Sequence, residues 1–527
     1  MQDRWNDYGF NTQYQLYWTG PEGDALIGSV KILKLGQQVG DGLQIEDDFD
    51  DLSDEYVSIG ESLDYYTRLT ELIPNLRQEV LDALRDVAMH PEYEGRFSAE
   101  IGWEKSLFRG YQRDGIAEYL ALARALVTTD YTYLPGNNGK FSFHVNGWTA
   151  SIPFYFSAPE LQNRFLIQSS DLDALGRTVV IVGRNGSGKS TLIYRLARVA
   201  FGSATSRSDG VFDQLGTIDP TGVGFPRIIA LSFSAFDSFA LPGIPPRNKD
   251  QPDEREQILS DALRGGGRFV FVGLRDVARE LKERIRDEPG PVESPRSHDD
   301  RVPKTYLKSV ETLADEFCGT IERLIAEGRD SSFRQALDRL TKDPTFSEWR
   351  DGDTLFALLA VGAREAYLGW STGQKIVVQV LANLAAYLIP RSLVLFDEPE
   401  MHLHPPLIAA MMHAVRHLLE AHKGSAIIAT HSPVVVQESL ASRVHIVRRD
   451  GSITSVVDPT IETFGESIGA LTSEVFGLNT ENTDFSSLLD LMTVHRDLEE
   501  IEKSFAPYGL SLQARAYVMK RLAERKG

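Results

Sequence analysis

Hydrophobic and polar positions follow two different periods along the chain, and these periods separate strands from helices. Short runs of apolar residues, many of them β-branched, occur at 179–182, 227–233, 392–396 and 426–430. Such runs are typical of strands that are buried on both faces of a sheet. Apolar positions at helical spacing follow the first run and fill the stretch before the third. This alternation predicts an α/β fold with a mostly parallel sheet that helices cover on both faces.

A second pattern, in which apolar and polar residues alternate, predicts antiparallel strands. Residues 140–157 alternate and are rich in aromatic side chains, with the turn-forming pair Asn146-Gly147 between two runs. They predict an antiparallel β lobe directly before the first buried strand. Alternation also predicts a strand pair at 14–18 and 27–33, and a hairpin at 444–457.

These patterns divide the chain into five predicted regions. The first, residues 1–135, is an α+β region of unknown task, because it combines a strand pair with apolar positions at helical spacing. A strand-like run at 269–275 lies inside a long charged stretch that is otherwise helical in pattern. The other four regions are the first half of the α/β core (136–245), a mainly helical insertion (246–360), the second half of the core (361–460) and a C-terminal helical region (461–527).

Composition and charge narrow the class of protein. A chain of 527 residues has room for about two to four domains. The net charge of −20 argues against a surface that coats nucleic acid, and much of the acidic excess lies at 46–55. The single cysteine, Cys318, fits a reducing compartment. We find no signal peptide and no run of 18 apolar residues, so a cytoplasmic protein without a membrane segment is expected.

The first buried strand runs into a glycine-rich stretch that predicts a phosphate-binding loop. Gly183 to Ser190 fits the pattern G-x-x-x-x-G-K-[ST], with a strand before it and a helix after it. Glycines let successive backbone N–H groups point into one concavity, and the helix adds the positive end of its dipole. The predicted nucleotide contacts are Gly183, Arg184, Asn185, Gly186, Ser187, Gly188, Lys189, Ser190 and Thr191.

Two of these residues, and two acids far downstream, predict Mg²⁺–ATP chemistry. Lys189 is expected to reach the β- and γ-phosphates, and the Ser190 hydroxyl to bind Mg²⁺ together with Asp397. Asp397 ends a buried strand, and Glu398 follows it at the position where a carboxylate can activate the attacking water. His431 ends another strand and is expected to contact the γ-phosphate. Lys189, Glu398 and His431 are therefore the predicted catalytic residues.

A second anion site is predicted at the start of a helix. Ser371, Gly373 and Gln374 are predicted to bind ATP through backbone N–H groups and the helix dipole. Within one subunit this site would lie far from the phosphate loop. We therefore expect it to close on ATP that is bound to a second copy of the chain. The alternative is an ordinary serine-capped helix.

His402 and His404 raise the question of a metal site. Alternate residues at a helix start diverge in direction, and no cysteine or third ligand is near them in the sequence. We therefore expect these histidines to bind no metal.

Together, Gly183–Ser190, Ser371–Gln374, Asp397-Glu398-Pro399 and Thr430-His431-Ser432 resemble the ABC-class ATPase motifs. Trp370 departs from the usual leucine of the signature motif, and residues 234–237 take the place of the usual glutamine loop. The sequence resembles the soluble branch of this class, which includes RecF, SMC-like and overcoming-lysogenization ATPases. Ser232–Phe239, Gly465–Gly469 and Val475-Phe476-Gly477 look like motifs of Septu-type defence ATPases, and retron-associated ATPases are similar.

The resemblance implies an ABC-type fold and an ATP-bridged, head-to-tail dimer that hydrolyses ATP. Residues 440–527 are too short for the Toprim nuclease of the overcoming-lysogenization enzymes, so the output is expected to be conformational. The expected partner is a separate effector nuclease, such as an HNH protein, in anti-phage defence. The alternatives are a DNA-repair or chromosome-maintenance ATPase, a transporter subunit and a non-hydrolysing scaffold. The basic end at 520–526 is either a solvated tail or a contact for a partner or nucleic acid.

Overall fold

The computed structural model describes residues 9–20, 23–41, 45, 49–70, 72–111, 113–131, 139–156, 174–242, 267–286, 300–476 and 484–525. The chain forms two compact units, Met1–Gly465 and Glu466–Gly527. Several segments singled out above lie partly or wholly outside the described residues: 21–22 between the strands of the first predicted pair, 46–48 in the acidic run, Gly477, and 526 at the basic end. No helix among the described residues is long and apolar enough to cross a membrane.

The N-terminal region is an antiparallel sheet covered by short helices. Its sheet has the order β1-β2-β3, and the predicted pairing of the first two strands is confirmed. Pro74 is the first residue of α2, where its fixed φ favours a helix start. The bounds are β1 (Gln13–Gly20), β2 (Gly23–Lys34), β3 (Tyr56–Gly60), α1 (Leu63–Leu69), α2 (Pro74–Ala83), η1 (Pro91–Tyr93), α3 (Glu94–Phe97), η2 (Trp103–Leu107) and α4 (Arg113–Thr128).

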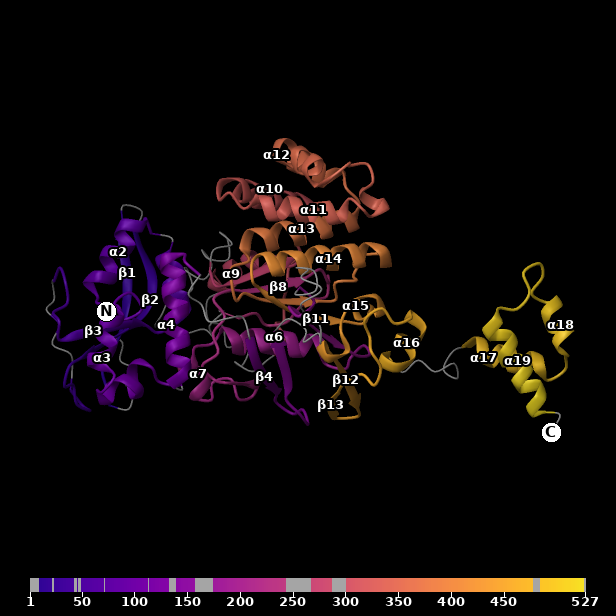
Figure 1. Cartoon of the computed structure of the whole chain (residues 1–527), viewed down its shortest axis with the longest axis horizontal. Coiled ribbons are helices and arrows are strands. Elements are labelled where there is room, and N and C mark those ends of the chain that lie inside the picture. The colour runs from indigo at the N-terminus through magenta and orange to yellow at the C-terminus, as the bar shows by residue number, and fades with distance from the viewer. Residues whose placement is uncertain are drawn as a thin grey trace, which may run out of the picture. The chain divides into compact units, whose positions relative to one another are not determined.

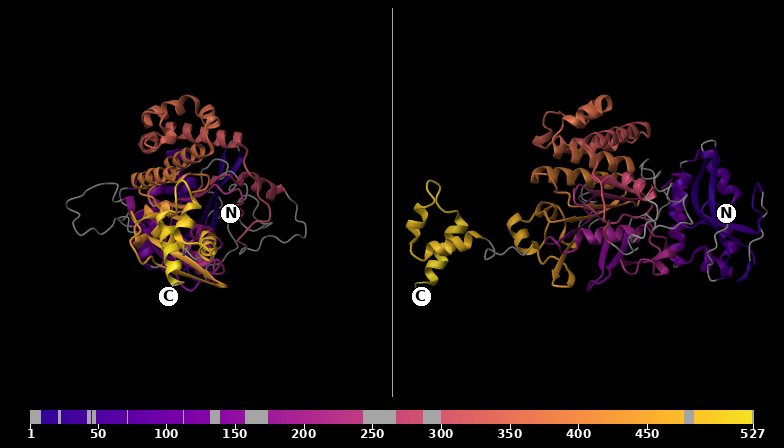
Figure 2. Two further views of the ribbon diagram at one scale, coloured as in Figure 1. Left: turned by 90° about the vertical axis from the view of Figure 1, so that its right-hand side faces the viewer. Right: turned by 180° about the vertical axis from the view of Figure 1, so that it is seen from behind.

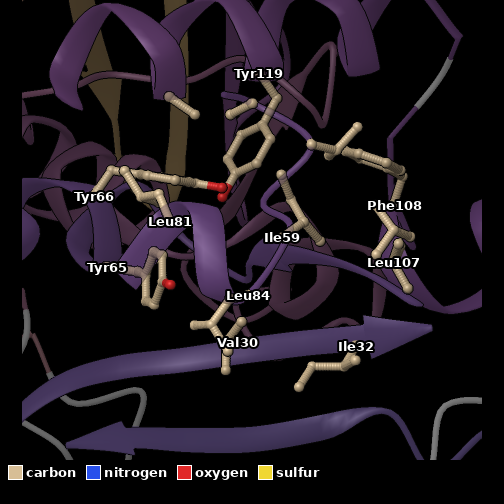
Figure 3. Close-up of a cluster of buried hydrophobic side chains, with 14 of the residues drawn as sticks. Val30, Ile32, Ile59, Tyr65, Tyr66, Leu81, Leu84, Leu107, Phe108 and Tyr119 are labelled. Atoms are coloured by element: carbon tan, nitrogen blue, oxygen red, sulfur yellow. The ribbon is translucent and has the colours of Figure 1, made fainter. Parts of the chain in front are cut away.

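A cluster of buried side chains between this sheet and its helices holds the region together (Figure 3). Tyr66 and Tyr119 point toward each other there, and both bind the backbone of Gly60: the Gly60 N–H donates to Tyr66 Oη at 3.0 Å, and Tyr119 Oη donates to the Gly60 carbonyl. Tyr66 Oη also donates to Asp86 Oδ2 at 2.9 Å. Burial raises the pKa of Asp86 to about 7, although the hydrogen bond from Tyr66 opposes the shift.

The centre of the larger unit is a seven-stranded sheet with the order β13-β12-β6-β11-β10-β8-β9. All neighbouring strands are parallel except β12 and β13, which form the predicted hairpin. Every residue of β6, β8 and β10 is buried, as the apolar runs predict. The bounds are β6 (Thr178–Val182), β8 (Ile228–Ser232), β9 (Phe269–Gly273), β10 (Leu393–Asp397), β11 (Ser425–Thr430), β12 (Val444–Asp450) and β13 (Ile453–Val457).

Two strands extend this sheet beyond what the motifs predict. β9 lies inside the predicted insertion at 246–360, yet it pairs with β8 in parallel and forms one edge of the central sheet. The insertion is therefore not separate from the α/β core. The apolar run of β9 predicted a strand, but it could not show which sheet that strand would join. At the other side of the sheet, β12 pairs in parallel with β6 and antiparallel with β13.

The predicted antiparallel lobe is confirmed as a small sheet of order β5-β4-β7. Pairing resumes only at Phe143 and Ile152, so Asn146-Gly147 lies within a longer connection and not in a two-residue hairpin turn. β7 was not predicted, because it is short and comes after the phosphate loop in sequence. The bounds are β4 (Gly139–Val145), β5 (Ile152–Phe156) and β7 (Gly216–Asp219).

Helices cover the central sheet in layers, which Figures 1 and 2 show from three directions. Helix α6 and the antiparallel lobe lie on one face, whereas α13 and α14 lie on the other, with α10, α11 and α12 outside them. The bounds of these helices and of the shorter ones beside them are α6 (Lys189–Phe201), α7 (Ala204–Ser208), α9 (Val277–Arg286), α10 (Val310–Ala326), α11 (Asp330–Leu340), η4 (Pro344–Phe346), α12 (Gly352–Gly369), α13 (Thr372–Tyr387), α14 (Pro405–Ala421), α15 (Pro433–Gln437) and η5 (Ala441–Arg443).

The smaller unit is helical among its described residues. It has its own small core of Leu489, Ile501, Leu510 and Val518. Its helices are α16 (Ile468–Phe476), α17 (Asp484–Thr493), α18 (Leu498–Lys503) and α19 (Leu512–Glu524).

Candidate nucleotide site

The predicted phosphate loop joins β6 to α6, and two of its glycines occupy places that a larger residue cannot take. Gly188 has φ +106°, and an added Cβ would lie 3.0 Å from the ring of Trp148. At Gly183 a Cβ would lie 2.4 Å from the carbonyl oxygen of Val447. The loop therefore follows the path that its sequence predicts, with Arg184, Asn185 and Gly186 exposed at its tip.

Below this tip the loop turns two polar side chains inward. Lys189 is buried, and its Nζ donates to the carbonyl oxygens of Gly183 at 3.0 Å and Arg184 at 3.2 Å. Burial lowers the pKa of Lys189, whereas Glu398, Asp397 and Glu400 oppose that shift. Ser187 Oγ is buried and has no hydrogen-bond partner within the part of the chain that the structure describes. Buried donors of this kind suit an anionic ligand.

Ser190 and Asp397 meet at the carboxyl edge of the sheet, as predicted. Ser190 Oγ donates to Asp397 Oδ1 at 3.1 Å, and Asp397 is almost fully buried at the end of β10. Burial raises the pKa of Asp397 to about 7, and Glu398 and Asp237 add to this shift. An oxygen pair with a poorly solvated carboxylate fits Mg²⁺, which takes only one or two protein oxygens when phosphates supply the others.

Glu398 and His431 lie side by side next to this pair. Glu398 has φ +49°, which is uncommon for a residue other than glycine, and its N–H donates to the carbonyl oxygen of Ala429. His431 Nδ1 lies 3.8 Å from Glu398 Oε1. Both side chains are partly exposed, so water and ligand can reach them. The structure therefore brings together Lys189, Ser190, Asp397, Glu398 and His431, the residues that the sequence predicts for metal binding and catalysis.

Glu400 is a member of this site that our prediction did not include. Its Oε2 accepts a hydrogen bond from Thr430 Oγ1 at 2.8 Å, and its Oε1 accepts one from the His431 N–H at 2.7 Å. His431 Nδ1 also lies 3.0 Å from Glu400 Oε1, but the two atoms form no hydrogen bond. Glu400 thus fixes the loop that carries His431. The repeated acid in Glu398-Pro399-Glu400 is the signal that sequence reasoning left unused.

Arg449 is a second residue that sequence reasoning missed. It lies on β12, and its Nη1 donates to the carbonyl oxygen of Gly186 in the phosphate loop at 3.4 Å. No sequence signal could have found it, because the contact depends on β12 lying next to β6.

Ser371–Gln374 forms the start of α13 and stays apart from the phosphate loop. Ser371 Oγ accepts from the Gln374 N–H, and Gln374 Oε1 accepts from the Ser371 N–H, which makes a capping box. Gln374 Nε2 donates to the carbonyl oxygen of Thr345. Helix α13 covers the face of the sheet opposite α6, and a Cβ on Gly373 would lie 3.4 Å from Leu403 and Leu407 near the start of α14. The side chains of Ser371 and Gln374 are thus bonded to each other and to Thr345, and not to the phosphate loop.

His404 has a structural role. Its Nδ1 accepts the N–H of Leu407 and so caps α14, while its Nε2 lies 2.9 Å from Thr345 Oγ1. Among the described residues no group of three or more His, Cys, Asp or Glu side chains is arranged to hold a metal ion.

Comparisons with known proteins bear on the second half of the site. A family profile described as "AAA domain, putative AbiEii toxin, Type IV TA system" matches residues 361–437, which include Ser371, Asp397, Glu398 and His431. Protein ea59 of Escherichia phage lambda is 29% identical over 506 residues, covering 92% of this chain and 87% of that protein. The SMC head domain from Thermotoga maritima aligns at 16% identity with 61% of this chain and 98% of its own, with a TM-score of 0.27, which is too low to support an argument.

The family match and the geometry agree on the class of protein. The match covers the segment that holds the signature-like helix start, the Asp397-Glu398 pair and His431. The fold brings the phosphate loop, which lies outside the match, to the same sheet edge as Asp397. Together they support a nucleotide-binding P-loop ATPase.

Proposed function

We propose that this protein hydrolyses ATP in sites that two copies of the chain build together. The first copy supplies the phosphate loop, Asp397, Glu398 and His431. The second copy supplies the start of α13, at Ser371–Gln374. The observation that carries this proposal is the pairing of Ser190 with Asp397 beside Glu398 and His431, while Ser371 is exposed at the start of α13.

Each side chain has a defined task in this proposal. Lys189, now on the loop carbonyls, turns to the triphosphate when ATP binds. Mg²⁺, when bound at Ser190 and Asp397, neutralises phosphate charge. Glu398 orients the attacking water and accepts its proton, and His431 holds the γ-phosphate. Loss of the γ-phosphate removes the contact to the Ser371 helix of the partner, so the two copies separate.

The proposal for the cellular role is that ATP turnover controls a separate effector. We infer a nuclease, such as an HNH protein, in anti-phage defence, because no nuclease motif was recognised in the sequence. One similarity supports this direction: the matching family is described as a putative toxin of a type IV toxin–antitoxin system. Native purification followed by mass measurement of the complex tests it. Absence of a nuclease from the complex and from the neighbouring genes would count against it.

Mixing two inactive variants tests the shared site. Lys189→Ala removes the phosphate contact of one half-site, and Ser371→Glu places a negative charge where the other half meets phosphate. Each variant alone is expected to lose hydrolysis. In a mixed dimer, one of the two sites keeps both wild-type halves. With random pairing we expect the mixture to recover about a quarter of the wild-type rate.

A matched control mixes Lys189→Ala with Glu398→Gln. Both of these changes act on the half-site that carries the phosphate loop, so every site in the mixed dimer is damaged and no activity should return. If the first mixture also stays inactive, or if Ser371→Glu alone hydrolyses ATP at the normal rate, the proposal of a shared site is wrong. Gel filtration of the Glu398→Gln variant with and without ATP then measures whether ATP converts single copies into dimers.

A further inference from the structure

The loop after β8 carries a buried carboxylate, Asp237, at the place where ABC-class ATPases usually have a glutamine. The Asp237 side chain is only 3% exposed, and both of its oxygens are occupied. Oδ2 accepts a hydrogen bond from Tyr194 Oη at 2.6 Å, and Oδ1 accepts one from the Phe239 N–H at 3.1 Å. Asp237 therefore points into the protein interior, whereas Phe236 beside it is exposed.

Asp237 faces a buried arginine that belongs to the loop after β9. The Arg275 side chain is fully buried, with Nη1 3.7 Å from Asp237 Oδ1. Its Nε and Nη2 bind the two oxygens of Glu280 at 2.7 Å each, in a two-pronged pair. Because charges buried in a medium of low dielectric need close partners, neither loop can move without rearranging this network.

One end of the network lies on the phosphate-loop helix. Tyr194 is one helical turn after Ser190 on α6, and its ring stacks on Phe239 with centroids 4.5 Å apart. Displacement of the start of α6 would therefore change the Tyr194–Asp237 contact directly.

The other end reaches residues 300–308. Glu280 Oε1 accepts the Tyr306 N–H at 3.3 Å, and the Asp276 N–H donates to the Tyr306 carbonyl at 2.8 Å. Arg195, next to Tyr194, binds both oxygens of Asp300 at 2.7 and 2.8 Å. Residues 300–308 are thus attached to α6 by two routes, of which one passes through Asp237.

We propose that Asp237 is a positioning residue that couples the phosphate loop to residues 274–282 and 300–308. Nucleotide contact at Lys189 and Ser190 shifts the start of α6, and Tyr194, Asp237 and Arg275 carry the shift to Glu280. Because residues 300–308 lead into α10, the helical layer then senses the nucleotide. This inference rests on the proposed nucleotide site.

Hydrogen–deuterium exchange of the full chain carrying Glu398→Gln, with and without ATP and Mg²⁺, tests the coupling. ATP should slow exchange in the phosphate loop and change exchange at 274–282 and 300–308. Adding Asp237→Asn should keep the first effect, abolish the change at 274–282 and reduce the change at 300–308, where the route through Arg195 and Asp300 remains. Tyr194→Phe, which removes only the hydroxyl, should weaken the second effect, and it decides the question if Asp237→Asn does not fold. Glu438→Gln is a matched control, because it alters the Arg416–Glu438 pair elsewhere and should leave both effects intact.

A kinetic measurement separates positioning from simple loss of structure. With Glu398 present, Asp237→Asn should lower kcat on the order of tenfold while the Kd for ATP changes by less than about threefold. If 300–308 respond to ATP equally with and without Asp237, or do not respond although the phosphate loop does, the coupling is wrong. If ATP does not protect the phosphate loop of the parent protein, the proposed function fails, and this inference fails with it.

Discussion

At the scale of single residues, the centre of the site is held by carboxylates with different surroundings. Asp397 is desolvated and paired with Ser190, whereas Glu398 is partly exposed and lies beside His431. Glu400 instead accepts hydrogen bonds from the His431 N–H and from the Thr430 hydroxyl. In the proposed mechanism Asp397 and Glu398 therefore serve the chemistry, whereas Glu400 serves the geometry.

The role of Glu400 leads to a prediction for Glu400→Gln. Glutamine keeps one acceptor oxygen but loses the charge and the second acceptor, so the loop of His431 should be less well fixed. We expect kcat to fall on the order of 10- to 100-fold with little change in the Kd for ATP. Steady-state hydrolysis and equilibrium nucleotide binding measure these two effects. Thr430→Val removes only one donor to Glu400 and should lower kcat by a smaller factor. An unchanged kcat in Glu400→Gln would contradict the role assigned to Glu400.

Asp86 gives a prediction about pH and stability. Its pKa is about 7 in the folded protein and near 3.8 when unfolded, so the folded state binds more protons between these values. The free energy of unfolding should therefore fall as pH rises through this window, by roughly 4 kcal/mol at most. Asp86→Asn removes the group that titrates and should flatten this dependence.

Calorimetry of the full chain from pH 4 to 8 tests the Asp86 prediction. The stability difference between Asp86→Asn and wild type should grow in favour of the variant as pH rises. Asp54→Asn, at an exposed position, is the control and should follow the wild type. Parallel curves for Asp86→Asn and wild type would show that burial does not keep the proton on Asp86.

At the scale of elements, the edge strand β9 shows how closely the sheet is packed. Gly273 pairs with Ser232, which in turn pairs with Asp397, so three strand ends lie in register at the nucleotide edge. A Cβ at Gly273 would lie 1.8 Å from the Ser232 carbonyl oxygen. The position of β9, and with it that of Arg275, thus depends on a glycine.

Gly273→Ala should therefore destabilise the protein. The added methyl meets backbone that cannot rotate away, and we expect a loss of about 2–4 kcal/mol in the free energy of unfolding, together with reduced ATPase activity. Gly319→Ala in α10 is the matched control, because a Cβ there meets nothing within 4 Å and alanine favours the helix by up to about 1 kcal/mol. Equal melting curves for the two variants would contradict the packing argument.

At the scale of the whole molecule, ion pairs join the N-terminal region to the amino edge of the central sheet, opposite the nucleotide edge. Arg268, just before β9, binds Asp64 at 3.0 Å, and Arg391, just before β10, binds Glu118. The unit at 466–527 has a core of its own. All predicted site residues lie in the larger unit.

This division predicts that a chain ending at Gly465 keeps the nucleotide site. Its Kd for ATP should stay within about threefold of the full-length value, because no residue of the site is removed and the remaining core is intact. Isothermal titration with ATP measures this, and a melting curve verifies that the shortened chain is folded. A folded chain that has lost ATP binding would show that residues 466–527 contribute to the site.

The sequence by itself determined the local parts of this protein. Apolar β-branched runs fix β6, β8, β10 and β11 because only buried strands suit them, and the glycine pattern fixes the phosphate loop because only glycine adopts its path. Polar residues at strand ends could be assigned to one sheet edge, since parallel strands share that edge. The amino-acid pattern alone was therefore enough to predict Ser190, Asp397, Glu398 and His431 as site residues.

The tertiary structure alone decided which distant segments are neighbours. β9 looks like an isolated strand in sequence and β12 like one half of a hairpin, and only their pairing with β8 and β6 makes them part of the central sheet. Asp237 and Arg275 carry no local pattern, because their roles depend on contacts with Tyr194 and Glu280 that the fold creates. Glu400 belongs to a repeated acid in the sequence, but only the fold shows that it binds Thr430. Periodicity records whether a residue is buried, but the partner of a buried charge is set by packing across the whole chain.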